Sequence, residues 1–185
     1  MLNSWVVMPT CLPTVLRRCH ACASERFRPN GKFRVNANHK LLDAWLLVLC
    51  TACGDTAKLT VLERMNVRSV RPELLDRMHD NDPGLAAELI QDPVVQRRSR
   101  IALDWAGAWR LDTGGSDHMD REVSDVIDVS VRFAARIPVR PVRLIAEGCG
   151  LSRAEVERLI TEGKLVSAVR LSGKLSGDFT FTLKR

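Results

Sequence analysis

The sequence contains no tyrosine, and its other aromatic residues are four tryptophans and five phenylalanines in 185 residues. A nucleic-acid surface built from many stacked aromatic rings is therefore disfavoured. No stretch reaches the roughly 18 uninterrupted apolar residues of a membrane span, since the best candidate, residues 41–50, contains Asp43. The N-terminus lacks the basic segment of a secretory signal. These absences predict a cytoplasmic protein that does not bind membranes.

Catalytic motifs are also missing. The sequence has no glycine-rich phosphate loop and no pairing of a nucleophile with a base. His79 and His118 stand alone beside aspartates, and such histidines are usually solvated side chains. We therefore expect no catalysis. An enzyme whose site is assembled from distant Asp and His residues remains the third alternative.

Charge is distributed unevenly along the chain, whose formal net charge is +6. Residues 1–60 contain 8 basic and 3 acidic side chains, residues 61–120 contain 8 and 11, and residues 132–185 contain 11 and 5. The basic excess at the two ends favours a polyanionic partner such as nucleic acid. The alternative is a solvated basic surface without a ligand.

Six cysteines in a reducing compartment indicate a metal site before disulfides. Four of them form two Cys-x-x-Cys pairs that are 27 residues apart, namely Cys19, Cys22, Cys50 and Cys53. Four thiolates fill the tetrahedral shell of one zinc ion, which makes the predicted site structural. A thiol switch that releases zinc on oxidation is the alternative. Cys11 and Cys149 lack paired spacing, so we interpret them as small apolar residues.

The segment between the two pairs predicts a hairpin. Residues 31–37 and 41–49 read as strands joined by a turn at 38–40, and the hairpin would return the second pair beside the first. This arrangement is typical of a zinc ribbon, which we place at residues 1–68, with a further strand at 59–67.

Residues 69–112 predict a short helical connector in which prolines begin the helices. Pro72 begins the first, to about residue 79. Asp82 and Asp92 each precede a proline and are predicted N-caps, for helices at 83–91 and 93–103. The glycine-containing residues 112–120 are the predicted linker.

The last segment, residues 121–185, predicts two helices between strands. Alternating apolar residues at 127–133 indicate a half-buried strand. A helix at 142–149 precedes a second, which Ser152 and Glu155 start as a capping box and Gly163 ends. Strands at 165–171 and 179–183 follow.

Within this segment a set of residues resembles the αL RNA-binding motif of a small-subunit ribosomal protein, tRNA synthetases and pseudouridine synthases. They are Leu144, Gly150-Leu151-Ser152-Arg153, Glu155, Leu159-Ile160 and Gly163-Lys164-Leu165. The resemblance implies that Arg153 contacts RNA phosphates, with Arg143, Arg158 and Lys164 as supporting charges. The alternative is an ordinary surface helix whose arginines pair with Glu155 and Glu162.

The whole chain is similar to a bacterial family described as domain of unknown function 1062. The residues that carry this similarity are Trp5-x-Val7-x-Pro9, Arg18-Cys19-x-x-Cys22, residues 32–37, Asp43-x-Trp45-Leu46, Cys50-x-x-Cys53 and Leu151-Ser152-Arg153. The similarity implies an architecture of ribbon, helices and αL-like module, and no established activity.

The sequence therefore predicts an α+β protein with a four-cysteine zinc ribbon, a short helical middle segment and an αL-like helix–helix–strand module. The leading functional hypothesis is binding of structured RNA, for example ribosomal or transfer RNA, with one structural Zn²⁺. The alternative is a protein–protein interaction adaptor that uses the edge of the ribbon or the acidic middle and has no nucleic-acid ligand.

Overall fold

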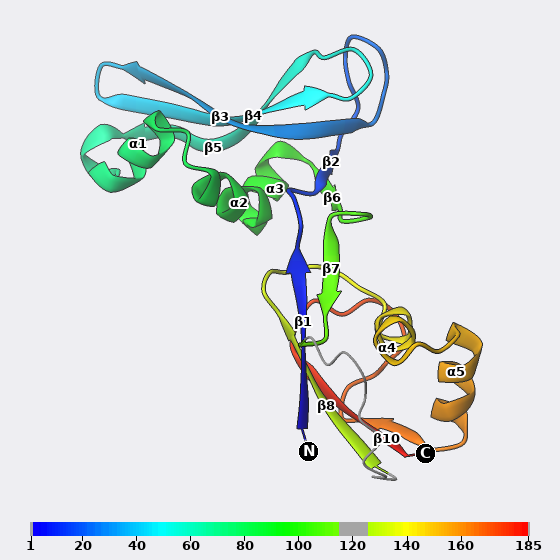
Figure 1. Cartoon of the computed structure of the whole chain (residues 1–185). Coiled ribbons are helices and arrows are strands. Elements are labelled where there is room, and N and C mark those ends of the chain that lie inside the picture. Colours follow the sequence, from blue (N-terminus) through cyan, green and yellow to red (C-terminus); the bar gives the residue numbers. More distant parts are fainter. Residues whose placement is uncertain (1, 115–125, 185) are drawn as a thin grey trace. The chain divides into compact units, whose positions relative to one another are not determined.

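The computed structural model describes residues 2–114 and 126–184 (Figure 1). The chain divides into two compact units. We call Leu12–Ala106 the central unit, and Met1–Cys11 together with Gly107–Arg185 the terminal unit. Each described part combines helices with a five-stranded sheet, so the fold mixes α and β structure as predicted.

The sheet of the central unit has the strand order β5-β4-β3-β2-β6, and all neighbours pair antiparallel. The strands are β2 (Thr14–Leu16), β3 (Arg26–Asn38), β4 (Leu41–Cys50), β5 (Thr56–Asn66) and β6 (Ala102–Asp104). β3 and β4 form the predicted hairpin, in which Asn38 pairs with Leu41 across a turn at His39 and Lys40. His39 adopts the left-handed conformation, with φ of 53°, that such a tight turn requires.

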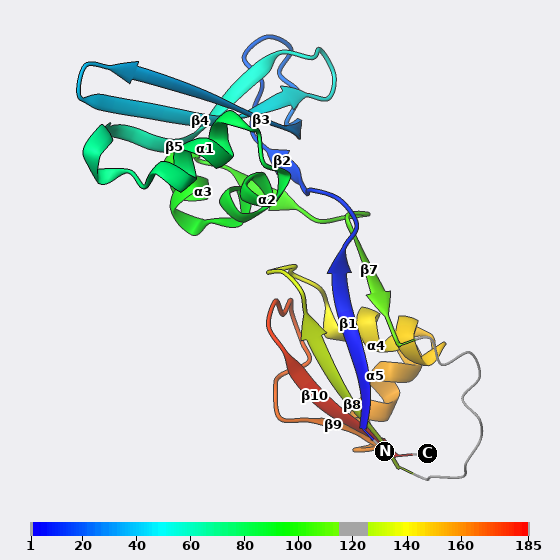
Figure 2. The ribbon, with the colours of Figure 1, turned by 60° about the vertical axis from the view of Figure 1, so that its left-hand side comes forward.

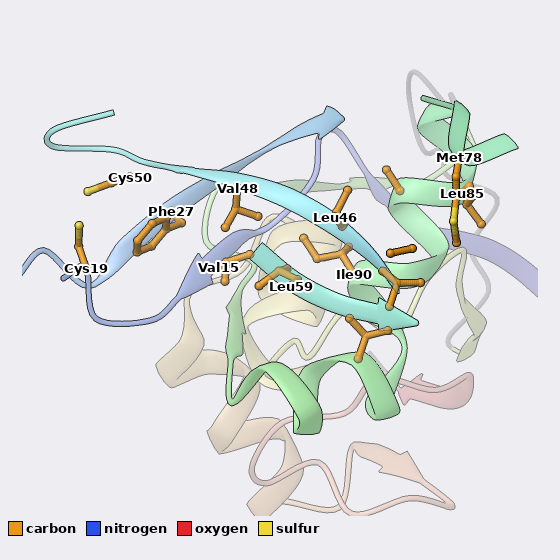
Figure 3. Close-up of a cluster of buried hydrophobic side chains, with 14 residues drawn as sticks. Val15, Cys19, Phe27, Leu46, Val48, Cys50, Leu59, Met78, Leu85 and Ile90 are labelled. Carbon is orange, nitrogen blue, oxygen red and sulfur yellow. The ribbon is translucent and has the colours of Figure 1, made fainter. Parts of the chain in front are cut away.

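Three helices cover one face of this sheet (Figures 1 and 2). They are α1 (Pro72–His79), α2 (Pro83–Gln91) and α3 (Pro93–Ser99), preceded by a 3-10 turn, η1 (Val67–Ser69). Alternate residues of β4 are fully buried, as period-2 alternation dictates for one face of a strand. Leu46 of β4 packs with Leu59 of β5 and with helix residues such as Met78, Leu85 and Ile90 in a single core (Figure 3).

The predicted aspartate caps are confirmed. The Leu85 amide donates to Asp82 at 3.0 Å, and the Val94 amide donates to Asp92 at 2.6 Å. α3 ends at Ser99, earlier than the predicted residue 103. The reason is that Arg100 adopts the left-handed conformation, with φ of 51°, and the residues after it form β6 against β2.

The sheet of the terminal unit has the strand order β7-β1-β8-β10-β9. The strands are β1 (Leu2–Pro9), β7 (Trp109–Asp112), β8 (Val126–Phe133), β9 (Leu165–Ser167) and β10 (Phe179–Lys184). β1 lies between β7 and β8 and runs parallel to β8. Trp5 and Val7 are buried there, so residues 2–9, which we predicted to belong to the ribbon, belong to this sheet.

Two helices pack on one face of the terminal sheet, α4 (Pro141–Cys149) and α5 (Arg153–Thr161). The capping box is confirmed, because the Glu155 amide donates to Ser152 at 3.2 Å and the Ser152 amide donates to the Glu155 carboxylate at 2.8 Å. β9 ends at Ser167, earlier than predicted. The Val169 amide turns back to the Ser167 hydroxyl at 3.3 Å, which takes the chain out of the ladder.

The two units run across the predicted divisions at 1–68, 69–112 and 121–185, because the predicted connector packs on the ribbon strands. Of the predicted linker, residues 115–120 lie outside the described residues, as do residues 121–125 and His118. Within the described ranges no helix is both long and apolar enough to cross a membrane.

Gly148 in α4 gives the first prediction. A Cβ atom at this position would overlap three atoms of the Trp5 indole, which rests on the helix. We expect Gly148→Ala to lower the free energy of unfolding by about 1–2 kcal/mol, because overpacking costs more than the ~1 kcal/mol that alanine gains in a helix. Urea denaturation measures this, with Gly177→Ala, which has open space at its Cβ, as the control. An unchanged midpoint for Gly148→Ala contradicts the packing.

Asp82 gives a pH-dependent prediction. Its hydrogen bonds with the Arg77 guanidinium (2.7 Å) and the Leu85 amide hold the pKa of this carboxyl below its ordinary value. A depressed pKa contributes stability that is present above the unfolded pKa, about 3.9, and is lost as the pH falls through the folded value. We therefore expect Asp82→Asn to destabilise at pH 7 and to approach the parent protein below about pH 4. Exposed Asp80→Asn is the control, and a pH-independent difference for Asp82→Asn contradicts the assignment.

Candidate metal centre

The two Cys-x-x-Cys segments form turns with the same backbone geometry. In each turn the amide of the fifth residue donates to the carbonyl of the first cysteine, at 3.2 Å from Ala23 to Cys19 and at 3.0 Å from Gly54 to Cys50. In each, the amide of that cysteine donates to the carbonyl of the sixth residue, at 2.7 and 2.8 Å. Ala23 and Gly54 both adopt positive φ, 60° and 75°. Both segments therefore present two sulfurs on one side of a tight turn.

The β3–β4 hairpin brings the turns together. The first turn precedes β3, and the second follows the last residue of β4. Phe27 pairs with Cys50 across the two strands, and the Thr51 amide donates to the Arg26 carbonyl at 3.0 Å. The predicted return of the second cysteine pair beside the first is confirmed.

The four sulfur atoms lie within 4.8 Å of one another. Cys19 Sγ is 3.7 Å from Cys53 Sγ, and Cys22 Sγ is 3.5 Å from Cys50 Sγ. A tetrahedron with metal–sulfur bonds of about 2.3 Å has sulfur–sulfur edges of about 3.8 Å. The cross-turn separations therefore match the size of one tetrahedral four-sulfur site.

Burial divides the cluster into an inner and an outer half. Cys19 and Cys50 are buried and belong to the same apolar core as Phe27, whereas Cys22 and Cys53 are exposed. Figure 3 shows the sulfurs of Cys19 and Cys50 at one end of this core, next to the Phe27 ring. An ion bound by all four sulfurs would therefore lie between the apolar core and the solvent.

The pKa values of two thiols in the cluster are shifted in opposite directions. The Cys53 amide donates to Cys50 and is the largest influence that lowers the pKa of this thiol to about 6. At Cys53 the Asp55 amide also lowers the pKa, but the hydrogen bond with Cys22, partial desolvation of the sulfur and the other two thiols outweigh it and raise the pKa to about 12. A bound cation would replace the protons that the crowded sulfurs otherwise keep. The donor set thus fits an ion that accepts four soft ligands.

Cys11 and Cys149 do not join the cluster and lie in the terminal unit. His79 is exposed at the last residue of α1, with no metal-ligating group assembled around it in the described residues. Within residues 2–114 and 126–184, none of these three residues belongs to a second group of metal-ligating side chains.

The four basic residues implied by the αL resemblance are all exposed on the terminal unit. Arg158 and Lys164 meet at Glu162, with nitrogen–oxygen separations of 3.8 and 3.2 Å. Arg143 instead lies over the ring of Trp109 in β7, 5.6 Å from the ring centroid. Arg153 is the first residue of α5.

Sequence reasoning missed the Arg143–Trp109 contact and the second face of β4. The contact joins segments far apart in the chain, for which a single sequence carries no signal. The signal for the second face was present, since Trp45, Leu47 and Leu49 alternate with the buried residues and are themselves half-buried.

Comparison with known proteins places most of the chain in one family. A family model described as a protein of unknown function (DUF1062) matches residues 35–171. This range begins within β3 and contains Cys50 and Cys53, while Cys19 and Cys22 precede it. No curated protein and no solved structure matches the chain significantly.

The cluster predicts one metal ion per chain. We expect protein purified after mild reduction to contain one equivalent by elemental analysis. Cys22→Ser and Cys53→Ser should each lower the metal content at least tenfold after dialysis against a weak chelator, because loss of one ligand opens the shell. Exposed Cys11→Ser is the matched control and should retain the metal. Equal metal content in all variants would show that the ion binds elsewhere.

Proposed function

The chain belongs to the DUF1062 family of proteins of unknown function, and we propose that it is a structural zinc protein that binds structured RNA through the basic helices of its terminal unit. The observation that carries the RNA proposal is the succession of α4, α5 and β9 with the exposed cations Arg143, Arg153, Arg158 and Lys164. This succession has the element order that the αL resemblance implies.

Zinc is the ion that the proposal assigns to Cys19, Cys22, Cys50 and Cys53. Zn²⁺ accepts four thiolates in a tetrahedron, has no redox chemistry of its own, and is bound structurally when all four positions are protein ligands. No position remains for a water molecule that the ion could activate. Its contribution is therefore folding free energy, because the ligands are brought together only in the folded chain.

The start of α5 supports phosphate contact. The first turn of a helix has amides without intrahelical partners and a partial positive charge, and both attract anions. Arg153 adds a full charge at the first helical position. The capping box occupies the amides of Ser152 and Glu155 and places the Glu155 carboxylate in this turn, so the phosphate contact is assigned chiefly to the Arg153 guanidinium.

The ion pairs at Glu162 do not prevent an anion from binding. Arg158 and Lys164 are 67% and 51% exposed in their side chains, and their shared partner Glu162 is 41% exposed. Ion pairs exposed to this extent contribute only about 0–1 kcal/mol. An RNA phosphate can therefore replace Glu162 as the partner of either cation.

Contacts with phosphates determine the affinity and the salt dependence of RNA binding. Phosphate contacts supply affinity and steep salt dependence but little choice of sequence. Strand addition by a protein partner at the β5 edge is disfavoured, because Lys58 O accepts from Arg17 and the Thr60 amide donates to Ser99. The structured-RNA proposal therefore ranks above the adaptor alternative.

The proposal is tested with the full chain and unfractionated transfer RNA between 50 and 200 mM KCl. We expect Arg143→Gln/Arg153→Gln to weaken binding about tenfold or more and to reduce the slope of log affinity against log salt by about 2, roughly one for each phosphate that is no longer neutralised. Arg132→Gln/Lys184→Gln is the matched control. It removes the same charge from the sheet face opposite the helices, since both residues alternate with buried neighbours.

The two variants separate the possible outcomes. An equal decrease in affinity in both would mean that RNA responds only to the net charge of the protein. Binding that is insensitive to salt, or absent in the parent protein, would contradict the proposal. Thermal denaturation of each variant checks that removing the Arg143 guanidinium from the Trp109 ring has not unfolded the terminal unit.

A further inference from the structure

The sheet of the central unit has a second face, on the side away from its helices. Odd-numbered residues of β4 point to this side, and three of them form a half-buried apolar ridge of Trp45, Leu47 and Leu49. We define the outer face as this ridge together with the exposed Arg28, Arg34 and Lys58. In Figures 1 and 2, α1, α2 and α3 lie on the opposite side of the sheet.

The strand register places the cations along both sides of the ridge. On β3, Arg34 pairs with Trp45 and Arg28 pairs with Leu49. On β5, Lys58 pairs with Leu47. Residues paired across antiparallel strands share a face, so these three charges flank the ridge.

The carboxylates of Asp43 and Asp104 already accept a hydrogen bond or form an ion pair with other residues. Asp43 lies on the same face of β4 and accepts a hydrogen bond from the Arg64 amide at 2.8 Å. Asp104 of β6 pairs with Arg26 at 2.8 Å. Both carboxylates therefore have partners other than Arg28, Arg34 and Lys58.

Basic and acidic residues are also unevenly divided between the two halves of the central unit's sequence. Residues 12–58, which contain β2, β3 and β4, have 8 basic and 3 acidic side chains, whereas residues 59–106, which contain the three helices, have 7 and 8. The net positive charge of the central unit is therefore carried by the segment that contains β2, β3 and β4. This distribution favours a polyanion at the outer face.

We propose that the outer face binds a short single-stranded segment of RNA, with phosphates at Arg28, Arg34 and Lys58 and one base on the Trp45 indole. The outer face belongs to the central unit, whereas the proposed structured-RNA site belongs to the terminal unit. The inference rests on the proposed function only in its choice of RNA over DNA as the ligand. A single-stranded nucleic acid carries flat apolar bases between phosphates, which matches an aromatic ridge between two rows of cations.

An acidic peptide fits less well. A peptide in an extended conformation gains most of its affinity by adding to a sheet edge, and two backbone groups of the β5 edge already bond Arg17 and Ser99. The outer face offers side chains instead of free backbone groups, and the Trp45 indole offers a stacking surface for one base.

Lys58 connects the two parts of the proposed site. Its ammonium lies 4.8 Å from the centroid of the Trp45 ring. The lysine is exposed and flexible, so it can leave the ring for a phosphate when a base takes its place. A base on the ring would quench the Trp45 fluorescence, which supplies a direct signal for this position.

The test uses the full chain and a 12-nucleotide oligouridine RNA, which forms no stable secondary structure. We expect the RNA to quench intrinsic tryptophan fluorescence. Trp45→Leu should remove most of the quenching and weaken binding several-fold, and Trp45→Phe should restore part of the affinity. Arg28→Gln/Arg34→Gln/Lys58→Gln should weaken binding at least tenfold and reduce the salt slope by about 2, at roughly 0.7 for each single-strand phosphate that is no longer neutralised.

The matched control removes three exposed cations of the helical side, as Arg71→Gln/Arg97→Gln/Arg98→Gln, and should change the affinity less than twofold. Equal decreases in oligouridine affinity in the two triple variants would overturn the proposal. Failure of oligouridine to bind the parent protein would also overturn it. So would quenching of Trp45 fluorescence by an oligoglutamate peptide but not by the RNA. Arg143→Gln/Arg153→Gln should keep oligouridine binding while its affinity for transfer RNA falls about tenfold or more. Failure of that variant to bind either ligand would place the single strand on the terminal unit and overturn the outer face, whereas failure of the transfer-RNA experiment alone leaves it intact.

Discussion

The meeting of two turns whose four sulfur atoms lie within 4.8 Å of one another is the constraint around which the sheet of the central unit is arranged. β3 begins soon after the first turn and β4 ends at the second, so closing the cluster fixes the pairing of Phe27 with Cys50. A slip of one residue would turn Leu46 and Val48 away from the helices. The β3–β4 ladder contains an irregularity between Pro29 and Phe33, where such a slip is easiest, and the cluster anchors the end that this irregularity would otherwise leave free.

Fixing the register also determines the character of both faces of the sheet. One face supplies the core that α1, α2 and α3 complete, and the other carries Trp45 and the flanking cations. The cysteine cluster supports both faces without taking part in either proposed interaction, because its sulfurs face one another. The ligand proposed for the outer face thus meets side chains whose register the cysteine cluster helps to set without contacting that ligand.

Much of the local structure could be predicted from sequence because its causes are local. The aspartate caps at Asp82 and Asp92, the capping box at Ser152 and the paired cysteine spacing each depend on residues a few positions apart. The partner of β1 could not be predicted, because Trp5 and Val7 are buried against strands more than 100 residues away. The end of α3 was missed for a related reason, since pairing of β6 with β2 overrides the apolar pattern that continues to Leu103. The cysteine cluster could be predicted from the sequence and the Arg143–Trp109 contact could not, because only the cysteines repeat a spacing.

The position of β1 between β7 and β8 in the terminal sheet has a consequence for synthesis of the chain. β1 leaves the ribosome before the whole central unit, whereas β8 and β10 are made after it. The central unit lies wholly between them in the sequence and can complete its fold while β1 still waits, with the apolar side chains of Trp5 and Val7 uncovered. Contacts of such long sequence separation form slowly, and unpaired apolar strands are prone to aggregation. The terminal unit is therefore the part of a nascent chain that most needs protection by a chaperone.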